Sequence, residues 1–304
     1  MADTAVVELS DEWAIYGDSL RDFSTDVVGA VRMSLPLQMV ARTDPGLVRS
    51  FNEDALFVDA LLGLAILADG MGGYNAGEVA SGMAVMRLAD DLGRLIGLDP
   101  SVAPEQIGGA SQVERHLVNE VGAANFAVFN ASRTVPQFSG MGTTLVLAWF
   151  YDNRMSVAHV GDSRLYRLRG EVFEQLTRDH SLLQEQLDLG MLTAEQARHA
   201  LHKNLVTRAL GVEPTVDVEV NTYDVRPGDI VLLCSDGLSD MVDDADLLLT
   251  LQTLGGNLPL AADHLVELAN DNGGRDNVSV ILVKVEGDFA VPRGWWQQLL
   301  ARLK

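Results

Sequence analysis

Predicted strands and helices fall in separate blocks along this chain. Short apolar or β-branched runs bounded by turn residues predict strands over 37–43, 55–59, 62–68, 143–150, 155–160, 165–169, 172–175, 216–223, 230–234 and 277–285. Helices are predicted over 76–97, 111–134, 243–253 and 260–270, where apolar residues recur at three- and four-residue steps. Segregated blocks favour a layered α+β fold over a doubly wound parallel sheet, in which strands and helices alternate.

The two long predicted helices also indicate part of the core. One side of the first helix carries the apolar residues Val79, Met83, Met86, Leu88, Leu92 and Ile96. We expect the Met and Phe side chains on the two helical stripes to lie in the core and not to contact a cofactor; these are Met83, Met86, Phe126 and Phe129.

Charge and cysteine content exclude several classes of protein. Lys and Arg number 22 against 43 Asp and Glu, a net charge of -21, which opposes binding to nucleic acid or to an anionic membrane surface. Cys234 is the single cysteine, so an intramolecular disulfide and a cysteine-based zinc site are excluded. We find no secretory signal and no apolar run of the ~18–20 residues that span a bilayer. We therefore expect a cytoplasmic protein without stable membrane insertion.

Acidic residues cluster at the ends of predicted strands. The run 62–68 ends in Asp69, which is followed by Gly70, Met71, Gly72 and Gly73. The acids that share this placement are Glu53, Asp54, Asp69, Asp162, Asp236 and Asp276. Any one of them could be a turn residue or a helix cap. Together at the ends of strands in one core they would repel one another, which raises their pKa values or requires a cation. Carboxylate oxygens without His or Cys favour Mg²⁺, Mn²⁺ or Ca²⁺ over zinc.

The glycines after Asp69 allow two other interpretations, and neither is well supported. A dinucleotide-binding loop would need its third glycine at position 75, where the chain has Asn75. A phosphate-binding loop of the Walker type needs Gly-Lys followed by Ser or Thr, and that sequence is absent.

Eight motifs occur in an order that resembles a known family: RTDPGLVRSFNEDA (42–55), ADGMGG (68–73), GMGTTL (140–145), HVGDSRLYR (159–167), LTRDHSLL (176–183), VTRALG (206–211), CSDGLSD (234–240) and GGRDNVSVILV (273–283). Over about residues 37–285 the chain resembles the bacterial branch of the metal-dependent type 2C (PPM) serine/threonine protein phosphatases. The resemblance implies a four-layer αββα sandwich with two central antiparallel sheets and a dinuclear metal cleft at one end. It places the phosphatase domain at 37–286, with a flap at about 180–205. Residues 1–36 are then an acidic extension, and residues 287–304 are a short amphipathic tail that we expect to dock on the domain.

The resemblance also assigns roles to the acids. It implies two Mg²⁺ or Mn²⁺ ions bridged by Asp69, and a bridging hydroxide that attacks phosphorus directly. One ion would be held by Asp236 and Asp276, and the other by Glu53 and the carbonyl oxygen of Gly70. A third, weaker metal site would use Asp162 and Asp236.

Other residues of the motifs complete the implied site. Arg49 would bind the phosphate, because a guanidinium fork suits two phosphate oxygens. Asp54 would orient a metal-bound water. Met71 replaces the His that eukaryotic relatives have at this position, so the general acid is left unassigned. We expect His159 to be a core histidine with its hydrogen bonds satisfied and His180 to cap or anchor the segment that it begins. His199 and His202 are expected at the surface.

The function expected from the resemblance is hydrolysis of phosphoserine and phosphothreonine in proteins, opposing a bacterial Ser/Thr kinase, by a monomeric enzyme. Two alternatives stay open: a catalytically silent module of the same fold that regulates or scaffolds, and a phosphoesterase for small molecules.

Overall fold

The structure is a computed structural model, and it describes residues 35–73, 76–97, 110–193, 196 and 205–291. The strands form two antiparallel sheets. The first has five strands in the order β1 (Leu37–Asp44), β11 (Val278–Val285), β10 (Ile230–Cys234), β7 (Arg164–Arg169) and β8 (Val172–Gln175). The second has six: β2 (Asp54–Asp59), β3 (Leu64–Met71), β5 (Leu145–Tyr151), β6 (Arg154–Val160) and β9 (Glu219–Asp224) in that order, with the two-residue β4 (Gly142–Thr143) paired to β3.

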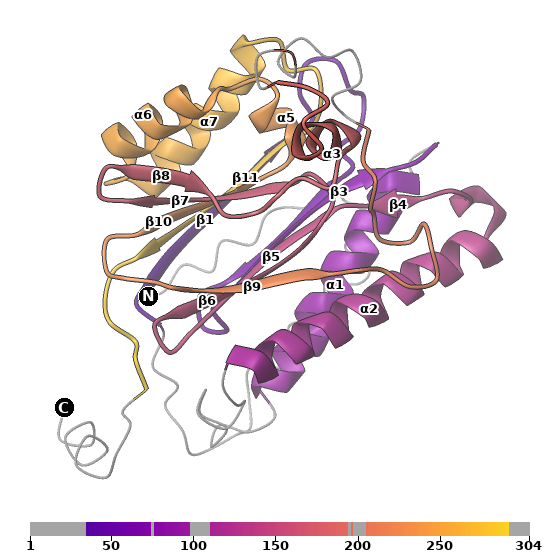
Figure 1. Ribbon diagram of the computed structural model, residues 1–304, viewed down its shortest axis with the longest axis horizontal. Helices are drawn as coiled ribbons and strands as arrows, with labels where there is room; N and C mark the ends of the chain where they lie inside the picture. Colours follow the sequence, from indigo (N-terminus) through magenta and orange to yellow (C-terminus); the bar gives the residue numbers. More distant parts are fainter. Residues whose placement is uncertain (1–34, 74–75, 98–109, 194–195, 197–204, 292–304) are drawn as a thin grey trace. The chain divides into compact units, whose positions relative to one another are not determined.

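Helices cover the outer faces of both sheets (Figure 1). Helices α1 (Ala76–Gly97) and α2 (Ala110–Thr134) pack on the second sheet through a core that includes Leu88 and Leu117. Helices α6 (Asp244–Leu254) and α7 (Leu258–Asp271) pack on the first sheet. A third apolar core lies between the sheets, where Leu67, Phe150 and Ile281 are buried. These four layers confirm the αββα sandwich expected from the resemblance.

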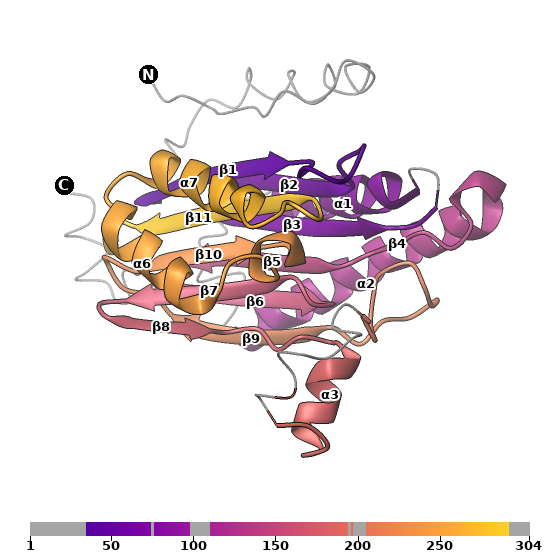
Figure 2. The same ribbon diagram turned by 90° about the horizontal axis from the view of Figure 1, so that it is seen from above.

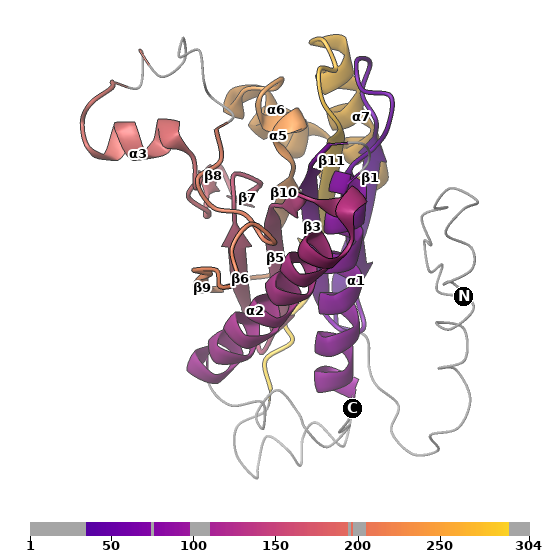
Figure 3. The same ribbon diagram turned by 90° about the vertical axis from the view of Figure 1, so that its right-hand side faces the viewer.

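Three short elements complete the described chain: the 3₁₀ turn η4 (Pro136–Phe138) and helices α3 (Leu182–Asp188) and α5 (Asp236–Ser239). Helix α3 projects beyond the edge of the sandwich at which β8 and β9 lie (Figure 2; Figure 3). It belongs to the expected flap. Much of the rest of that flap, including His199 and His202, lies outside the described residues, as do 1–34 and the tail from 292 onward. Among the described helices, none combines the length and apolar character needed to cross a membrane.

Local sequence explains several element boundaries. Asp243 caps α6 by accepting a hydrogen bond from the backbone N–H of Asp246, and Asn257 caps α7 in the same way through Leu260. The β5–β6 hairpin turns at Asp152 and Asn153, whose φ angles are 46° and 54°. Asp and Asn tolerate this left-handed conformation best among residues with a side chain, and two such residues suit a two-residue hairpin.

The predicted elements agree with the structure except in a few places. Helix α1 has the predicted bounds, whereas the strand predicted over 143–150 is divided into β4 and β5, and β9 begins at Glu219. The strand predicted over 62–68 runs instead from Leu64 through Asp69 to Met71. Two core predictions are wrong: Met86 is 55% exposed and Phe126 is 53% exposed. Met86 lies two positions from the buried Leu88, and Phe126 lies two positions from the buried Val128. Two residues span about 200° of a helix, so each side chain points away from the core.

Candidate active site

Two carboxylates face each other near one end of the β2–β3 pair. Asp54 and Asp69 are directly opposite in the antiparallel register, so their side chains leave the same face of the sheet. Two threonines fix the backbone of Asp69: Thr144 Oγ1 accepts from its N–H at 3.0 Å, and Thr143 Oγ1 donates to its carbonyl oxygen at 2.8 Å. The position of Asp69 is therefore set by β3 and by the segment in which β4 leads into β5.

Further carboxylates reach the same place from neighbouring strand ends. Asp236 begins α5 just after β10, and Asp276 lies two residues before β11, the strand that pairs with β10. Asp162 follows the end of β6. The approach between the first two segments is close, because a Cβ atom added to Gly237 would lie 1.9 Å from the carbonyl oxygen of Asn277. A glycine after Asp236 is thus a packing requirement.

Charge repulsion shows that these acids share one site. Burial raises the pKa of Asp69 well above its usual value, and the charges of Asp54, Asp236, Asp162 and Asp276 raise it further. Burial followed by the charge of Asp162 likewise raises the pKa of Asp236. Burial is the main cause that raises the pKa of Asp54 to about 7 and that of Asp162 to about 6. The group cannot carry its full negative charge at neutral pH without a compensating cation.

Glu53 is held against the start of α1 by two glycines. Its carboxylate accepts a hydrogen bond from the backbone of Gly77, and its carbonyl oxygen accepts from Gly70 N–H at 3.0 Å. A Cβ atom on Gly70 would lie 2.1 Å from the carbonyl oxygen of Gly77, and one on Gly77 would lie 2.5 Å from Glu53 Oε1. Bare backbone at both positions lets the carboxylate approach the end of β3.

Arg49 brings a positive charge to this acidic site. Its Nη2 donates to Asp276 Oδ2 at 2.7 Å, and this hydrogen bond is the largest cause that raises the pKa of Arg49. The side chain remains 51% exposed, so the guanidinium is accessible to a ligand from solvent.

Two residues that support the site, Asn277 and Ser235, are not among the site residues that the sequence predicts. Asn277 donates through Nδ2 to the carbonyl oxygens of Pro45 at 3.0 Å and Phe51 at 2.9 Å, while its Oδ1 accepts from Glu53 N–H at 2.8 Å. Ser235 donates to Asp54 Oδ2 at 2.9 Å. Both residues lie in the motifs CSDG and RDN, directly beside the acids that were recognised, which is the signal that could have identified them.

The donor set fits hard divalent cations. It consists of carboxylate oxygens, with the Gly70 carbonyl at the same strand end, and oxygen-only ligands suit Mg²⁺ and Mn²⁺. The buried Oδ1 of Asp54 has no hydrogen-bond partner among the described residues, although Oδ2 of the same carboxylate is bonded to Ser235. A buried acceptor of this kind is costly unless a ligand or water satisfies it.

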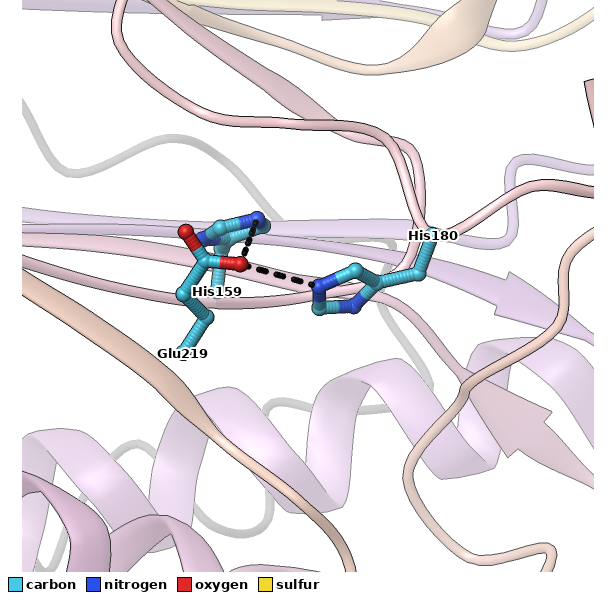
Figure 4. A group of neighbouring side chains, drawn as sticks. All are labelled: His159, His180 and Glu219. Carbon is cyan, nitrogen blue, oxygen red and sulfur yellow. Dashed lines mark hydrogen bonds and ion pairs between the residues drawn. The ribbon is translucent and has the colours of Figure 1, made fainter. Parts of the chain in front are cut away.

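A second group of possible metal ligands lies nearby and has a different character (Figure 4). His159 and His180 stack with their ring centroids 4.7 Å apart, and their Nε2 atoms lie 4.0 Å and 3.5 Å from Glu219 Oε2. His159 Nε2 is also 2.9 Å from the carbonyl oxygen of Arg178 and 3.4 Å from the backbone nitrogen of the same residue, and the shorter contact favours a proton on Nε2. His180 Nδ1 accepts from Gly161 N–H at 3.2 Å, which favours the neutral tautomer with its proton on Nε2, facing Glu219 Oε2 at 3.5 Å and Arg208 Nη1 at 3.4 Å.

These hydrogen bonds argue against a metal at the histidine pair. In the tautomers that the shortest contacts favour, both Nε2 atoms carry protons, whereas a metal would need their lone pairs. The contacts instead tie the segment that begins at Arg178 to β6 and β9. They confirm the two expectations from sequence, that His159 is a satisfied core histidine and that His180 anchors the segment that it begins.

Most residues of this site lie in a segment that matches a known protein family. A family model described as protein phosphatase 2C matches residues 48–264, which include Glu53, Asp69, Asp162 and Asp236. The chain belongs to the protein phosphatase 2C family. It is 40% identical to the serine/threonine protein phosphatase PstP of Mycobacterium tuberculosis over 257 residues. These residues cover 84% of this chain and 46% of PstP. The serine/threonine phosphatase stp of Listeria innocua is 38% identical over 80% of this chain and 94% of its own length.

Solved protein phosphatase 2C structures have the same fold. The catalytic domain of PstP, crystallised with two manganese ions, matches with a TM-score of 0.71 and 39% identity over 82% of this chain and 97% of that domain. The chain spans about half the length of the full-length PstP that it matches, but nearly all of that catalytic domain.

Proposed function

We propose that this chain is a metal-dependent phosphatase that hydrolyses phosphoserine and phosphothreonine monoesters in proteins. The observation that carries this proposal is the convergence of Asp69, Asp236 and Asp276 on one site that also holds Arg49. We further propose that it acts in the cytoplasm as a monomer and opposes a bacterial Ser/Thr kinase. Support for the activity comes from its family and from relatives named as Ser/Thr phosphatases.

The carboxylates are proposed to hold two Mg²⁺ or Mn²⁺ ions. Asp69 would contact both, Asp236 and Asp276 would hold one, and Glu53 with the Gly70 carbonyl would hold the other. Asp162 and Asp236 are the proposed ligands of a third, weaker site. When bound, such ions neutralise the phosphate dianion and supply a nucleophile at neutral pH.

The remaining residues position the substrate and water. The exposed guanidinium of Arg49 is proposed to bind two phosphate oxygens, a geometry for which its planar fork is suited. The Oδ1 of Asp54 is proposed to accept a hydrogen bond from water in the site, while Ser235 holds the other oxygen. Met71 at the end of β3 cannot donate a proton, so we assign no side chain to protonate the leaving alcohol.

The retained acids argue against a catalytically silent module. Such a module could lose the metal-binding carboxylates without consequence, yet the chain has all of them, and its structure brings them together despite their mutual repulsion. A phosphoesterase for small molecules would use the same chemistry, so this alternative must be separated by substrate and not by metal dependence.

The activity is tested by phosphate release from a phosphothreonine peptide. We expect release to require Mn²⁺ or Mg²⁺, to stop in EDTA, and to fall by about 10³-fold or more in Asp69→Asn and Asp236→Asn. Asp246→Asn, at an exposed position on α6, is the matched control and should keep wild-type activity. Full activity in EDTA would contradict the proposed mechanism. A much higher kcat/KM for a small phosphoester than for any peptide would favour the small-molecule alternative.

A further inference from the structure

Three large apolar side chains are exposed on the loop that carries Arg49. Leu47 is 70% exposed, Val48 is 67% exposed and Phe51 is 58% exposed. Together these three residues are called the apolar rim below. Single exposed apolar residues are common on protein surfaces, but a concentration of them beside a binding site indicates an interaction surface.

The loop is held firmly although its apolar side chains are exposed. The N–H groups of Leu47 and Val48 both donate to the Gly274 carbonyl oxygen, at 2.7 Å and 3.2 Å. The carbonyl oxygen of Phe51 accepts from Asn277 Nδ2 at 2.9 Å. The backbone is thus fastened to the loop that precedes β11, which also carries Asp276. A rigid backbone that presents apolar side chains loses little conformational entropy when a ligand covers them.

The apolar rim is continuous with the proposed phosphate site. Arg49 lies between Val48 and Phe51 in the chain, and its guanidinium donates to Asp276 at 2.7 Å. A phosphate group alone reaches Arg49 without covering these side chains. A phosphorylated residue within a polypeptide also brings neighbouring residues to the rim, so the rim distinguishes a peptide from a small ester.

The charge of the apolar rim indicates which residues of a substrate, next to its phosphorylated residue, can bind there. Residues 45–51, PGLVRSF, contain one charged residue, Arg49, in a chain whose net charge is -21. Arg49 is engaged with the carboxylate of Asp276 and is the proposed partner of the phosphate. Residues 45–51 themselves therefore offer apolar contact and no second cation, and the next cation is the exposed Arg275 on the neighbouring loop.

We propose that Leu47, Val48 and Phe51 form a docking surface for apolar side chains that flank the phosphorylated residue of a protein substrate. The enzyme then prefers phosphopeptides with a large aliphatic or aromatic residue within two positions of the phosphothreonine. This inference rests on the proposed phosphatase activity and names the substrate class of that site.

The test compares two phosphothreonine peptides of equal charge, one with Leu and one with Ser at the flanking positions, using the full chain with Mn²⁺. We expect wild type to favour the Leu peptide by about tenfold in kcat/KM, mainly through KM, because burial of an apolar side chain is worth at least that factor. The triple variant Leu47→Ser, Val48→Ser, Phe51→Ser should reduce this preference to about twofold or less. Phe51→Leu should retain it, which separates apolar contact from a general effect of mutating the loop.

The matched control is Val172→Ser, Leu249→Ser, Leu260→Ser, which removes three exposed apolar side chains elsewhere, at 61%, 61% and 49% exposure. This control should keep both the preference and the rate on p-nitrophenyl phosphate. A rim variant that keeps the preference, or a wild type without one, would overturn the inference. Loss of a dimer in light scattering on mutating the rim would also overturn it, because a second copy would then be the occupant. Absence of hydrolysis of both peptides would contradict the phosphatase activity itself, whereas hydrolysis without preference contradicts only the docking surface.

Discussion

Asp69 is the residue on which the charges of the site converge. Its pKa is raised by burial and by four neighbouring carboxylates, so in the absence of a cation its negative charge is unfavourable. The charges that act on it come from segments that adjoin both sheets. A carboxylate whose charge is unfavourable in the metal-free protein is expected to bind a metal cation, which compensates that charge.

The variant Asp69→Asn separates these two effects. In EDTA at pH 8 the amide removes one buried charge and keeps the side-chain shape, so we expect the midpoint of thermal unfolding to rise by about 2–6 °C. The increase that Mn²⁺ produces in wild type should become much smaller in the variant, because stabilisation by a ligand depends on its affinity for the folded state. Thermal unfolding with and without Mn²⁺ measures both. A lower midpoint for the variant in EDTA would show that the charge of Asp69 is already compensated within the chain.

His180 predicts a pH dependence of stability that is independent of metal. Burial is the main cause that lowers its pKa, and the nearby His159 and Arg208 lower it further, while Glu219 acts in the opposite direction. The unfolded chain therefore binds a proton at about pH 6.5, before the folded protein does. The contribution of His180 to stability is present above pH 6.5 and is lost as pH falls toward the folded pKa.

Urea unfolding of wild type and His180→Gln between pH 5 and 7.5, in EDTA, tests this prediction. We expect the free energy of unfolding to fall more steeply with decreasing pH in wild type than in the variant. The comparison of slopes remains informative even if the variant is less stable throughout. Equal slopes would mean that His180 has the same pKa in the folded and the unfolded protein, and would contradict the prediction.

At the level of secondary-structure elements, the periodicity of apolar residues predicted the positions of strands and helices better than it predicted which side chains of a helix are buried. The bounds of α1 were predicted in full, yet Met86 was assigned to the wrong side, because sequence spacing fixes a stripe only to within about one residue step. The four-residue α5 was missed because so short an element has no period.

The acids of the candidate site were predictable from the sequence, whereas the contacts that hold them in place were not. Acids at strand ends could be read from the sequence, and the family resemblance assigned their roles. The register that sets Asp54 opposite Asp69, and the contacts of Asn277 with the 45–53 loop, depend on packing between segments distant in sequence. No local pattern encodes those contacts.

Asn277 joins the loop before β11 to the 45–53 loop and should be important for stability. It makes three hydrogen bonds to the 45–53 loop and is 5% exposed, so Asn277→Ala removes the side-chain partner of three backbone groups of that loop. We expect a loss of about 2–4 kcal/mol in the free energy of unfolding, from three bonds of about 0.5–1.5 kcal/mol each. Urea unfolding in EDTA measures this loss. Asn272→Ala, at an exposed position with one side-chain bond to the Met241 carbonyl, is the control and should cost about 1 kcal/mol or less. Equal costs for both variants would contradict the proposed linking role.

At the scale of the whole molecule, the sandwich brings together residues that are more than 200 positions apart in the chain. Asp54 and Asp69 lie in strands of the second sheet, and Glu53 directly precedes one of them. Asp236 and Asp276 lie next to the ends of strands of the first sheet. The separate strand and helix blocks predicted a layered α+β fold, and the resemblance predicted two sheets with helices outside. A cation bound by both sheets links them at this end, so its binding should stabilise the whole domain and not one loop.

Anomalous diffraction from crystals grown with Mn²⁺ tests the central claim most directly, because it places the metal within the fold. We expect two strong manganese peaks at Asp69, one beside Asp236 and Asp276 and the other beside Glu53 and the Gly70 carbonyl. No strong peak is expected at His159, His180 and Glu219. Manganese bound at the histidine pair, with none at Asp69, would contradict the account.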